Sequence, residues 1–188
     1  RGTLQAAVSS SGTVNPVRQV SVGSQVSGQI VEMFADFNTE VKSGQLIARI
    51  DPQSFEYKVR QAGADLEAAR AAVVNAQANV VAAMANVSKA QLDADNARRD
   101  LARKQDLLAQ AFISPAEFDT ARNLAGTLGE ALKVTQAQLD VAKAQVASAQ
   151  AAVKQREAAL AQAKVDLEHT QIRSPVDGVV LLRSVEPG

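Results

Sequence analysis

The middle of the chain, from Asp51 to Thr170, carries apolar residues at every seventh position in two successive arms. The larger members of this series are Val59, Leu66, Val73, Val80, Val87, Leu101 and Leu108 in the first arm and Phe118, Leu132, Leu139, Val146, Val153, Leu160 and Leu167 in the second. A second apolar series, mostly alanine, lies three positions after the first. Two apolar series per heptad indicate a coiled-coil seam, and a period of seven indicates a left-handed supercoil. We therefore predict two long helices that pack through this seam.

A turn between the two arms is predicted at residues 111–115. The run Ser114–Glu117 reads as a capping box, with a serine cap, proline at the first helical position and a glutamate three residues after the cap. Asp51-Pro52 is a comparable start signal for the first arm. Each arm spans roughly 80 Å at 1.5 Å per residue. Antiparallel pairing about the turn sets Val73 beside Val153, with a shift of three or four residues left open.

Short strands are predicted on the N-terminal side of this hairpin. Residues 1–20 contain two loosely alternating runs, Leu4–Val8 and Val17–Val22. A strand around a glycine follows at Val26–Val31, then a turn at Val41–Gly44. The apolar run Gln45–Ile50 predicts one more strand before the first helix.

The strand unit occurs twice in the chain. Ser24–Ile30 parallels Ser174–Val180, and Val41–Gly44 parallels Val185–Gly188. The glycines of these motifs, which we expect at turns, are Gly28, Gly44, Gly178 and Gly188. Since the long hairpin lies between the two copies, we expect both copies to form one small β-domain.

The predicted fold class is α+β, a long antiparallel helical hairpin inserted into a split β-domain. Residues 21–51 and 170–188 form the split domain, whose second half is incomplete because it has no counterpart of Gln45–Ile50. Residues 52–169 form the hairpin, with its tip at 111–115. Residues 1–20 are expected to contribute a strand to a further β-region.

Composition narrows the function. Lys+Arg and Asp+Glu are 20 each, so the chain lacks the basic surface that nucleic-acid binding requires. With no cysteine, disulfides and thiolate metal sites are excluded. The longest uncharged run, Ala71–Ser88, contains Asn75, Asn79 and Asn86, which lipid would leave unsatisfied, so it is interpreted as coiled coil. Because the chain starts at Arg1 inside a predicted strand, we expect an anchor or targeting segment outside it.

Catalysis has little support in the sequence. Asp93, Asp95 and Asp100 are interspersed with arginines and read as a solvated helix face. His169 is the sole histidine and, at the end of the second arm, suits the helix macrodipole. No phosphate loop or nucleophile triad is found. We therefore expect no enzyme activity, no cofactor and no metal.

The half-motifs resemble those of the membrane fusion protein family, the HlyD-like periplasmic adaptors of efflux and secretion systems. Val26–Ile30 with Val41–Pro52 resembles the first half-lipoyl motif, and Leu167–Gly188 resembles the second. The run Val22–Gln29 is most similar to adaptors of macrolide-type ABC exporters. The resemblance implies a split lipoyl-like (barrel-sandwich hybrid) domain and a hairpin, with residues 1–20 belonging to a β-barrel or membrane-proximal region.

The resemblance also implies partners and a place in the cell. Members join a TolC-like outer-membrane channel to an inner-membrane transporter, either ABC or proton-driven. They form homo-oligomers, hexamers by family expectation. We thus expect a periplasmic protein held at the inner membrane by a segment absent from this chain.

The predicted tip carries residues that match the family's channel-docking signature: Arg103, Leu107 and Ser114. By resemblance these meet the tips of the channel. Each also has a plain structural interpretation. Ser114 is a helix cap in either case, Leu107 adjoins the seam residue Leu108, and Arg103 lies among other charged residues.

Two other function classes stay open. A biotinyl or lipoyl carrier domain of an enzyme complex would share the half-motifs, but it needs a lysine in a tight hairpin between them. Here the long helical insertion occupies that place, and Lys42 lies in the other turn. A purely structural coiled-coil spacer would fit the hairpin and leave the flanking half-motifs unexplained.

Overall fold

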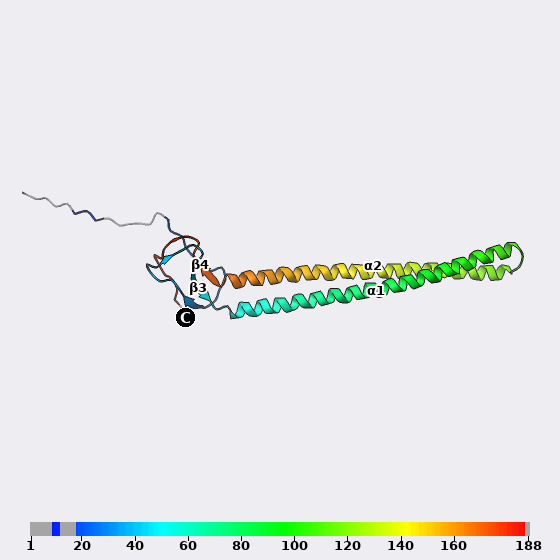
Figure 1. Ribbon diagram of the computed structural model, residues 1–188, viewed down its shortest axis with the longest axis horizontal. Helices are drawn as coiled ribbons and strands as arrows, with labels where there is room; N and C mark the ends of the chain where they lie inside the picture. Colours follow the sequence, from blue (N-terminus) through cyan, green and yellow to red (C-terminus); the bar gives the residue numbers. More distant parts are fainter. Residues whose placement is uncertain (1–8, 12–17, 187–188) are drawn as a thin grey trace, which may run out of the picture. The chain divides into compact units, whose positions relative to one another are not determined.

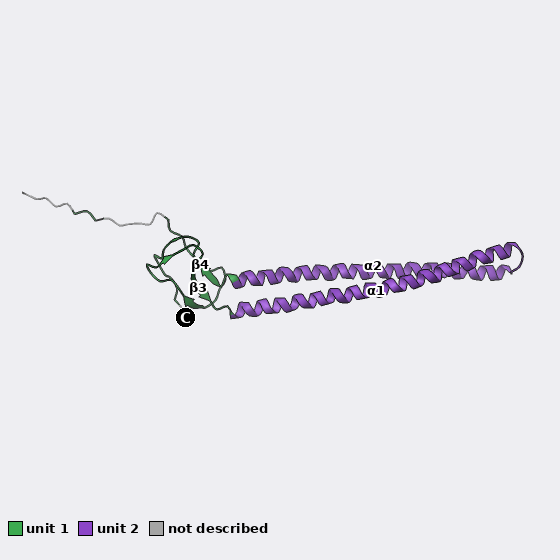
Figure 2. Ribbon diagram, in the orientation of Figure 1, with its two compact units in different colours: residues 1–52, 168–188 green, residues 53–167 purple. Residues whose placement is uncertain are grey.

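The computed structural model describes residues 9–11 and 18–186 and divides the chain into two compact units. Unit 1 comprises Arg1–Pro52 and Glu168–Gly188, and unit 2 comprises Gln53–Leu167 (Figure 2). The chain leaves unit 1 once and returns to it once. Unit 2 is therefore an insertion in the sequence of unit 1.

Unit 2 consists of two antiparallel helices that lie side by side (Figure 1). Helix α1 spans Gln53–Ala109 and helix α2 spans Pro115–Glu168, which are 57 and 54 residues. The predicted hairpin is confirmed. Helix α1 begins one residue after Pro52 and ends two residues before the predicted Ala111, whereas α2 begins at Pro115 as the capping box predicts.

The side chains of the predicted seam are buried or half-buried along both helices, and most positions between them are exposed. The fully buried residues are Phe55, Leu66, Ala94 and Ala97 on α1 and Ala121, Ala125, Leu132 and Ala142 on α2. Ala94 is 0% exposed. Because the distance between helix axes depends on the side chains at the contact, the alanines allow a close approach.

The two helices also meet through charged side chains. Arg70 lies 3.4 Å from Glu157, and Arg156 lies 3.8 Å from Asp65. Both pairs are exposed, and such pairs contribute about 0–1 kcal/mol each. Val73 and Val153 line one open cavity of about 420 Å³ between these helices, as the predicted antiparallel register requires.

Unit 1 contains two small antiparallel sheets. The first has the order β1-β3-β4, formed by Ile30–Met33, Leu46–Ile50 and Gln171–Arg173. The second pairs β2, Glu40–Val41, with β5, Gly178–Val179. In both sheets a strand that precedes the hairpin in sequence pairs with a strand that follows it. The two halves therefore form one β-domain, which confirms the split-domain prediction.

Backbone hydrogen bonds join the two halves around the turn at residues 42–45. The Gly44 N–H donates to the Ser174 carbonyl at 2.7 Å, and the Ser174 N–H donates to the Gln45 carbonyl at 2.9 Å. The Ser43 N–H donates to Oδ1 of Asp177 at 2.7 Å. The core of unit 1 includes Ile50, which is 2% exposed.

Several strand predictions are wrong in extent. The strand expected at Val26–Val31 begins at Ile30, where pairing with β3 starts opposite Ile50. Val41 belongs to β2 rather than to the turn, because it pairs with Gly178. Residues 18–22 form no strand, since none of the described strands pairs with them. The predicted strand Leu4–Val8 lies outside the described residues.

Candidate functional site

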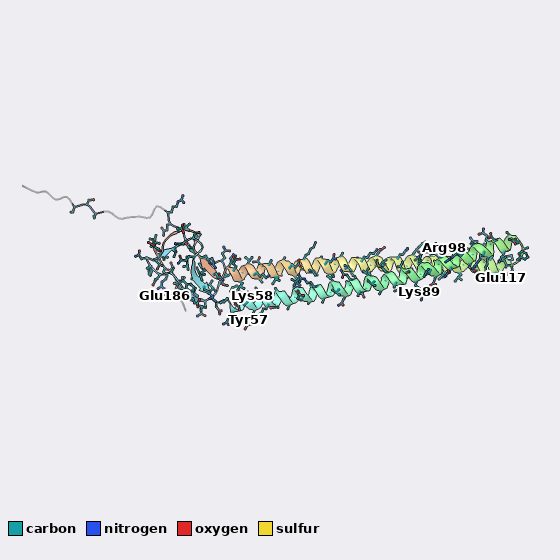
Figure 3. The ribbon with its side chains drawn as sticks, viewed as in Figure 1. Tyr57, Lys58, Lys89, Arg98, Glu117 and Glu186 are labelled. Atoms are coloured by element: carbon teal, nitrogen blue, oxygen red, sulfur yellow. The ribbon has the colours of Figure 1, made fainter. Side chains whose placement is uncertain are left out.

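The N-terminus of α2 is closed by reciprocal hydrogen bonds between Ser114 and Glu117. The Glu117 N–H donates to Ser114 Oγ at 3.3 Å, and the Ser114 N–H donates to Oε2 of Glu117 at 3.1 Å. The predicted capping box is confirmed. Figure 3 shows Glu117 at the end of the hairpin where the chain turns, with Arg98 and Lys89 farther back along α1.

The C-terminus of α1 is closed by a Schellman motif that the sequence did not indicate. The Phe112 N–H donates to the Leu107 carbonyl and the Ala111 N–H donates to the Leu108 carbonyl, both at 2.9 Å. Ala111 occupies the left-handed position of the motif, with φ 58°. Glycine usually fills this position, so its absence at 111 hid the motif from sequence reasoning.

The three signature residues lie on the outside of this end of the hairpin. The Arg103 side chain is 75% exposed and lies 3.2 Å from Oδ1 of Asp100. Leu107 is 39% exposed, while the adjacent seam residue Leu108 is half-buried. Ser114 is exposed although its hydroxyl takes part in the cap. The group presents a cation, an aliphatic side chain and a hydroxyl to solvent, a set suited to contact with another protein.

The motif glycines of unit 1 have different surroundings. Gly44 has φ 82°, a conformation that strains other residues. A Cβ on Gly28 would lie 2.4 Å from Cγ2 of Ile50, so this position needs glycine for close packing. A Cβ on Gly178 would meet nothing within 4 Å. Gly188 lies outside the described residues.

Residues with potential for catalysis are dispersed in the described part of the chain. No group of three His, Cys, Asp or Glu side chains there is placed to hold a metal. Asp100 pairs with Arg103 and with Lys104, in agreement with a solvated helix face. Lys42 is exposed beside a turn whose backbone is bound to the other half of unit 1. None of the described helices is long and apolar enough to cross a membrane.

The architecture that these observations define is a long helical hairpin inserted in the sequence of a split β-domain. Residues 18–188 match the family model described as the RND membrane fusion protein (MFP), barrel-sandwich hybrid domain. The chain belongs to this membrane fusion protein family. The relatives in this family are non-enzymatic proteins, in agreement with the expectation of no enzyme activity.

Two curated relatives support the assignment to this family. The chain is 32% identical over 177 residues to the multidrug resistance protein MdtA of Klebsiella pneumoniae, covering 94% of this chain and 33% of that protein. It is 30% identical over 177 residues to MdtA of Yersinia pestis, covering 94% of this chain and 30% of that protein. The chain thus spans about a third of the length of these curated relatives.

Among solved structures, MacA from Actinobacillus actinomycetemcomitans is similar, with 29% identity, a TM-score of 0.49 and coverage of 90% of this chain and 44% of that one. A MacA–MexA chimera carrying the Pseudomonas aeruginosa MexA hairpin has 26% identity, a TM-score of 0.48 and coverage of 91% and 42%. The assignment to macrolide-type adaptors stays a prediction.

Proposed function

We propose that the chain is part of a periplasmic adaptor in a multidrug efflux system. Its hairpin tip binds an outer-membrane channel, and unit 1 engages an inner-membrane transporter, with an anchor segment outside the chain holding the protein at the inner membrane. Membership of the family and the names of the MdtA relatives support this. In this proposal residues 21–51 and 170–188 are the lipoyl-like domain, 52–169 the hairpin, and 1–20 part of a barrel or membrane-proximal region.

The observation that carries the proposal is the exposure of Arg103, Leu107 and Ser114 together at the turn of the hairpin. Arg103 offers charge-assisted hydrogen bonds beyond the one it makes to Asp100, since a guanidinium has five donors. Leu107 supplies apolar area, and Ser114 keeps a hydroxyl at the surface. A substitution at this end would therefore weaken binding without unfolding the helices.

The test uses the full-length protein in a bacterium that lacks its own adaptor, with drug resistance and cross-linking to the channel as readouts. Arg103→Asp is expected to abolish both. Arg98→Asp is the matched control, because Arg98 is also exposed on α1 and also pairs with an aspartate three residues earlier, Asp95 at 3.7 Å. If the Arg103→Asp variant is as well folded as the wild type and still gives wild-type resistance and cross-linking, channel docking is refuted.

We also propose that the adaptor assembles as a ring in which hairpins stand side by side, a hexamer by family resemblance. Two exposed apolar stripes support this. The α1 stripe consists of Val74, Val81 and Met84, which are 63%, 67% and 51% exposed. The α2 stripe consists of Val134 and Val141, which are 57% and 60% exposed.

The heptad positions of these residues set the geometry of such a ring. With Val73 and Leu132 at seam position a, the α1 stripe occupies positions b and e, and the α2 stripe occupies position c. In an antiparallel pair, positions b and e of both helices border one edge of the seam, and positions c and g border the other. The two stripes therefore face opposite flanks of the hairpin. Packing α1 of one copy on α2 of the next is a heterologous contact, which closes into a ring when the rotation between successive copies divides a full turn.

A further inference from the structure

The turn of the hairpin holds a strained residue next to an exposed aromatic ring. Ala111 has φ 58°, a left-handed conformation that strains a residue with a Cβ. Phe112 follows it and is 73% exposed, a value that only Leu182 equals among the exposed large hydrophobic residues of the described chain. Strained backbone of this kind persists where the surrounding structure imposes it, and it gathers at functional positions.

The Schellman bonds fix the backbone on which this ring stands. The Phe112 N–H donates to the Leu107 carbonyl, and the Ala111 N–H donates to the Leu108 carbonyl. In such a motif the residue after the left-handed position usually packs on the side chain five or six residues earlier in the helix. Here Leu107 is 39% exposed and Phe112 is 73% exposed, so most of the Phe112 ring lies in solvent.

The segment around the ring has no charged residue, and the carboxylate at the turn, that of Glu117, accepts a hydrogen bond from the Ser114 N–H at 3.1 Å. Residues 107–116 are uncharged, and Asp106 and Glu117 flank them. Arg103 and Lys104, the nearest cations in sequence, both lie close to the carboxylate of Asp100. An anionic lipid surface attracts clusters of basic residues, which this turn lacks. An uncharged turn with an exposed ring and aliphatic neighbour instead matches an apolar pocket on a protein.

We propose that Phe112 is the anchor of the hairpin tip, inserted into an apolar pocket of the outer-membrane channel, and that the left-handed Ala111 positions it. This rests on the proposed docking function and adds a residue that the signature Arg103, Leu107 and Ser114 does not include. Buried aromatic anchors held by a rigid backbone dominate the affinity of many interfaces, with polar residues around them. Leu107 extends the apolar contact, and Arg103 and Ser114 form its polar rim.

The experiment measures binding of full-length adaptor variants to a purified TolC-like outer-membrane channel from the host bacterium. Phe112→Ala is expected to weaken binding roughly tenfold or more, since each tenfold is 1.4 kcal/mol and anchor truncations commonly exceed that. Phe112→Tyr keeps the ring but adds a hydroxyl that an apolar pocket leaves without a hydrogen-bond partner, so it should bind more tightly than Phe112→Ala and less tightly than wild type. Tyr57→Ala, which removes a 62% exposed ring elsewhere on α1, is the control and should change nothing.

Ala111 is tested in the same assay. Ala111→Gly accepts the left-handed conformation and should bind within about twofold of wild type. Ala111→Val disfavours that conformation and should weaken binding, while helix content by circular dichroism stays near wild type.

The outcomes separate this inference from the proposed function. If Phe112→Ala binds normally while Arg103→Asp binds weakly, docking holds and the anchor is refuted. If both bind normally, docking at this tip is refuted. If Phe112→Ala instead loses binding to phosphatidylglycerol vesicles, or loses tip-to-tip self-association of the adaptor without its channel, the ring serves a lipid surface or a second copy, and the inference is overturned.

Discussion

Ser114 and Glu117 each bind the backbone N–H of the other at the start of α2, with Glu117 N–H to Ser114 Oγ at 3.3 Å and Ser114 N–H to Glu117 Oε2 at 3.1 Å. The serine that resembles a docking residue is therefore also a structural cap. Any substitution of Ser114 changes two properties at once, the stability of the helix start and the surface offered to a partner.

These two roles of Ser114 can be separated. Ser114→Ala is expected to lower the free energy of unfolding by about 1 kcal/mol through loss of the cap, whereas Ser114→Asp retains a capping oxygen and should cost much less. Thermal unfolding followed by circular dichroism at 222 nm measures both. If Ser114→Asp nevertheless loses channel binding, the hydroxyl has a role beyond the cap. Equal stability of Ser114→Ala and wild type would contradict the capping role.

Gly28 and Gly178 occupy matching places in the internal repeat, but only Gly28 is expected to be sensitive to substitution by alanine. Gly28→Ala would bring a Cβ to 2.4 Å from Cγ2 of Ile50, a side chain that is 2% exposed. Such overpacking costs typically about 1–3 kcal/mol. Gly178→Ala is the control, because its Cβ would meet nothing within 4 Å. Hydrogen exchange of amides in β3 measures the local effect. Greater loss of protection in Gly178→Ala than in Gly28→Ala would contradict this account.

The seam predicts a contrast between two neighbouring residues of α2. Leu132 is 7% exposed and Val134 is 57% exposed. Leu132→Ala should lower stability by about 2–4 kcal/mol, since it removes a buried side chain and leaves a cavity. Val134→Ala should stay within about 0.5 kcal/mol, because it is exposed and alanine is the better helix former. Urea unfolding of the hairpin compares them, and a similar loss for both would mean that the seam does not stabilise this region.

The heptad repeat predicted the hairpin because the signal is redundant. Each of the seam positions from Val59 to Leu167 repeats the same information, so one polar substitution would not obscure it. The capping box at Ser114 was equally readable, since all its residues lie within one turn of sequence. Helix ends and seams depend on local residues, which a single sequence contains.

The strands of unit 1 were harder to predict because distant pairing decides them. β2 and β5 have two residues each, which is too few for an alternating pattern of apolar and polar residues to appear. Val41 pairs with Gly178, and the whole hairpin separates these two residues in the sequence. At the tip, the Schellman motif was missed because Ala111 adopts a conformation that usually identifies glycine. The candidate docking residues were named from the family resemblance, and residue patterns alone did not distinguish Arg103 from other solvated charges.

The ring arrangement predicts a specific cross-link. Val73 and Val153 lie at the same level of the hairpin. Counting the same number of residues from each toward the tip shows that Met84 lies level with Ala142, the neighbour of Val141. Because the two stripes face opposite flanks, Met84→Cys with Val141→Cys cannot close a disulfide within one hairpin, where the Cα atoms would need to lie within about 7 Å. This chain has no cysteine of its own, so within it the two introduced thiols are the only ones. Oxidation of the full-length protein should therefore give a ladder of covalent oligomers. Efficient dimers from Met84→Cys alone, with no ladder from the pair, would indicate a two-fold contact instead.

Ala111 and its neighbour Gln110 should respond in opposite directions to glycine. Ala111 has φ 58°, so Ala111→Gly removes backbone strain. Glycine also has greater entropy in the unfolded chain, which offsets part of this effect. The free energy of unfolding should therefore rise by about 0.5–1 kcal/mol. Gln110 is not among the residues with positive φ, so Gln110→Gly gains no such relief and should lose about 0.5–1 kcal/mol. Both variants leave the Schellman bonds of Ala111 and Phe112 possible. Thermal unfolding at 222 nm should thus rank Ala111→Gly above wild type and Gln110→Gly below it. If Ala111→Gly were the less stable of the two, the left-handed turn would not be strained, and the positioning of Phe112 would need another explanation.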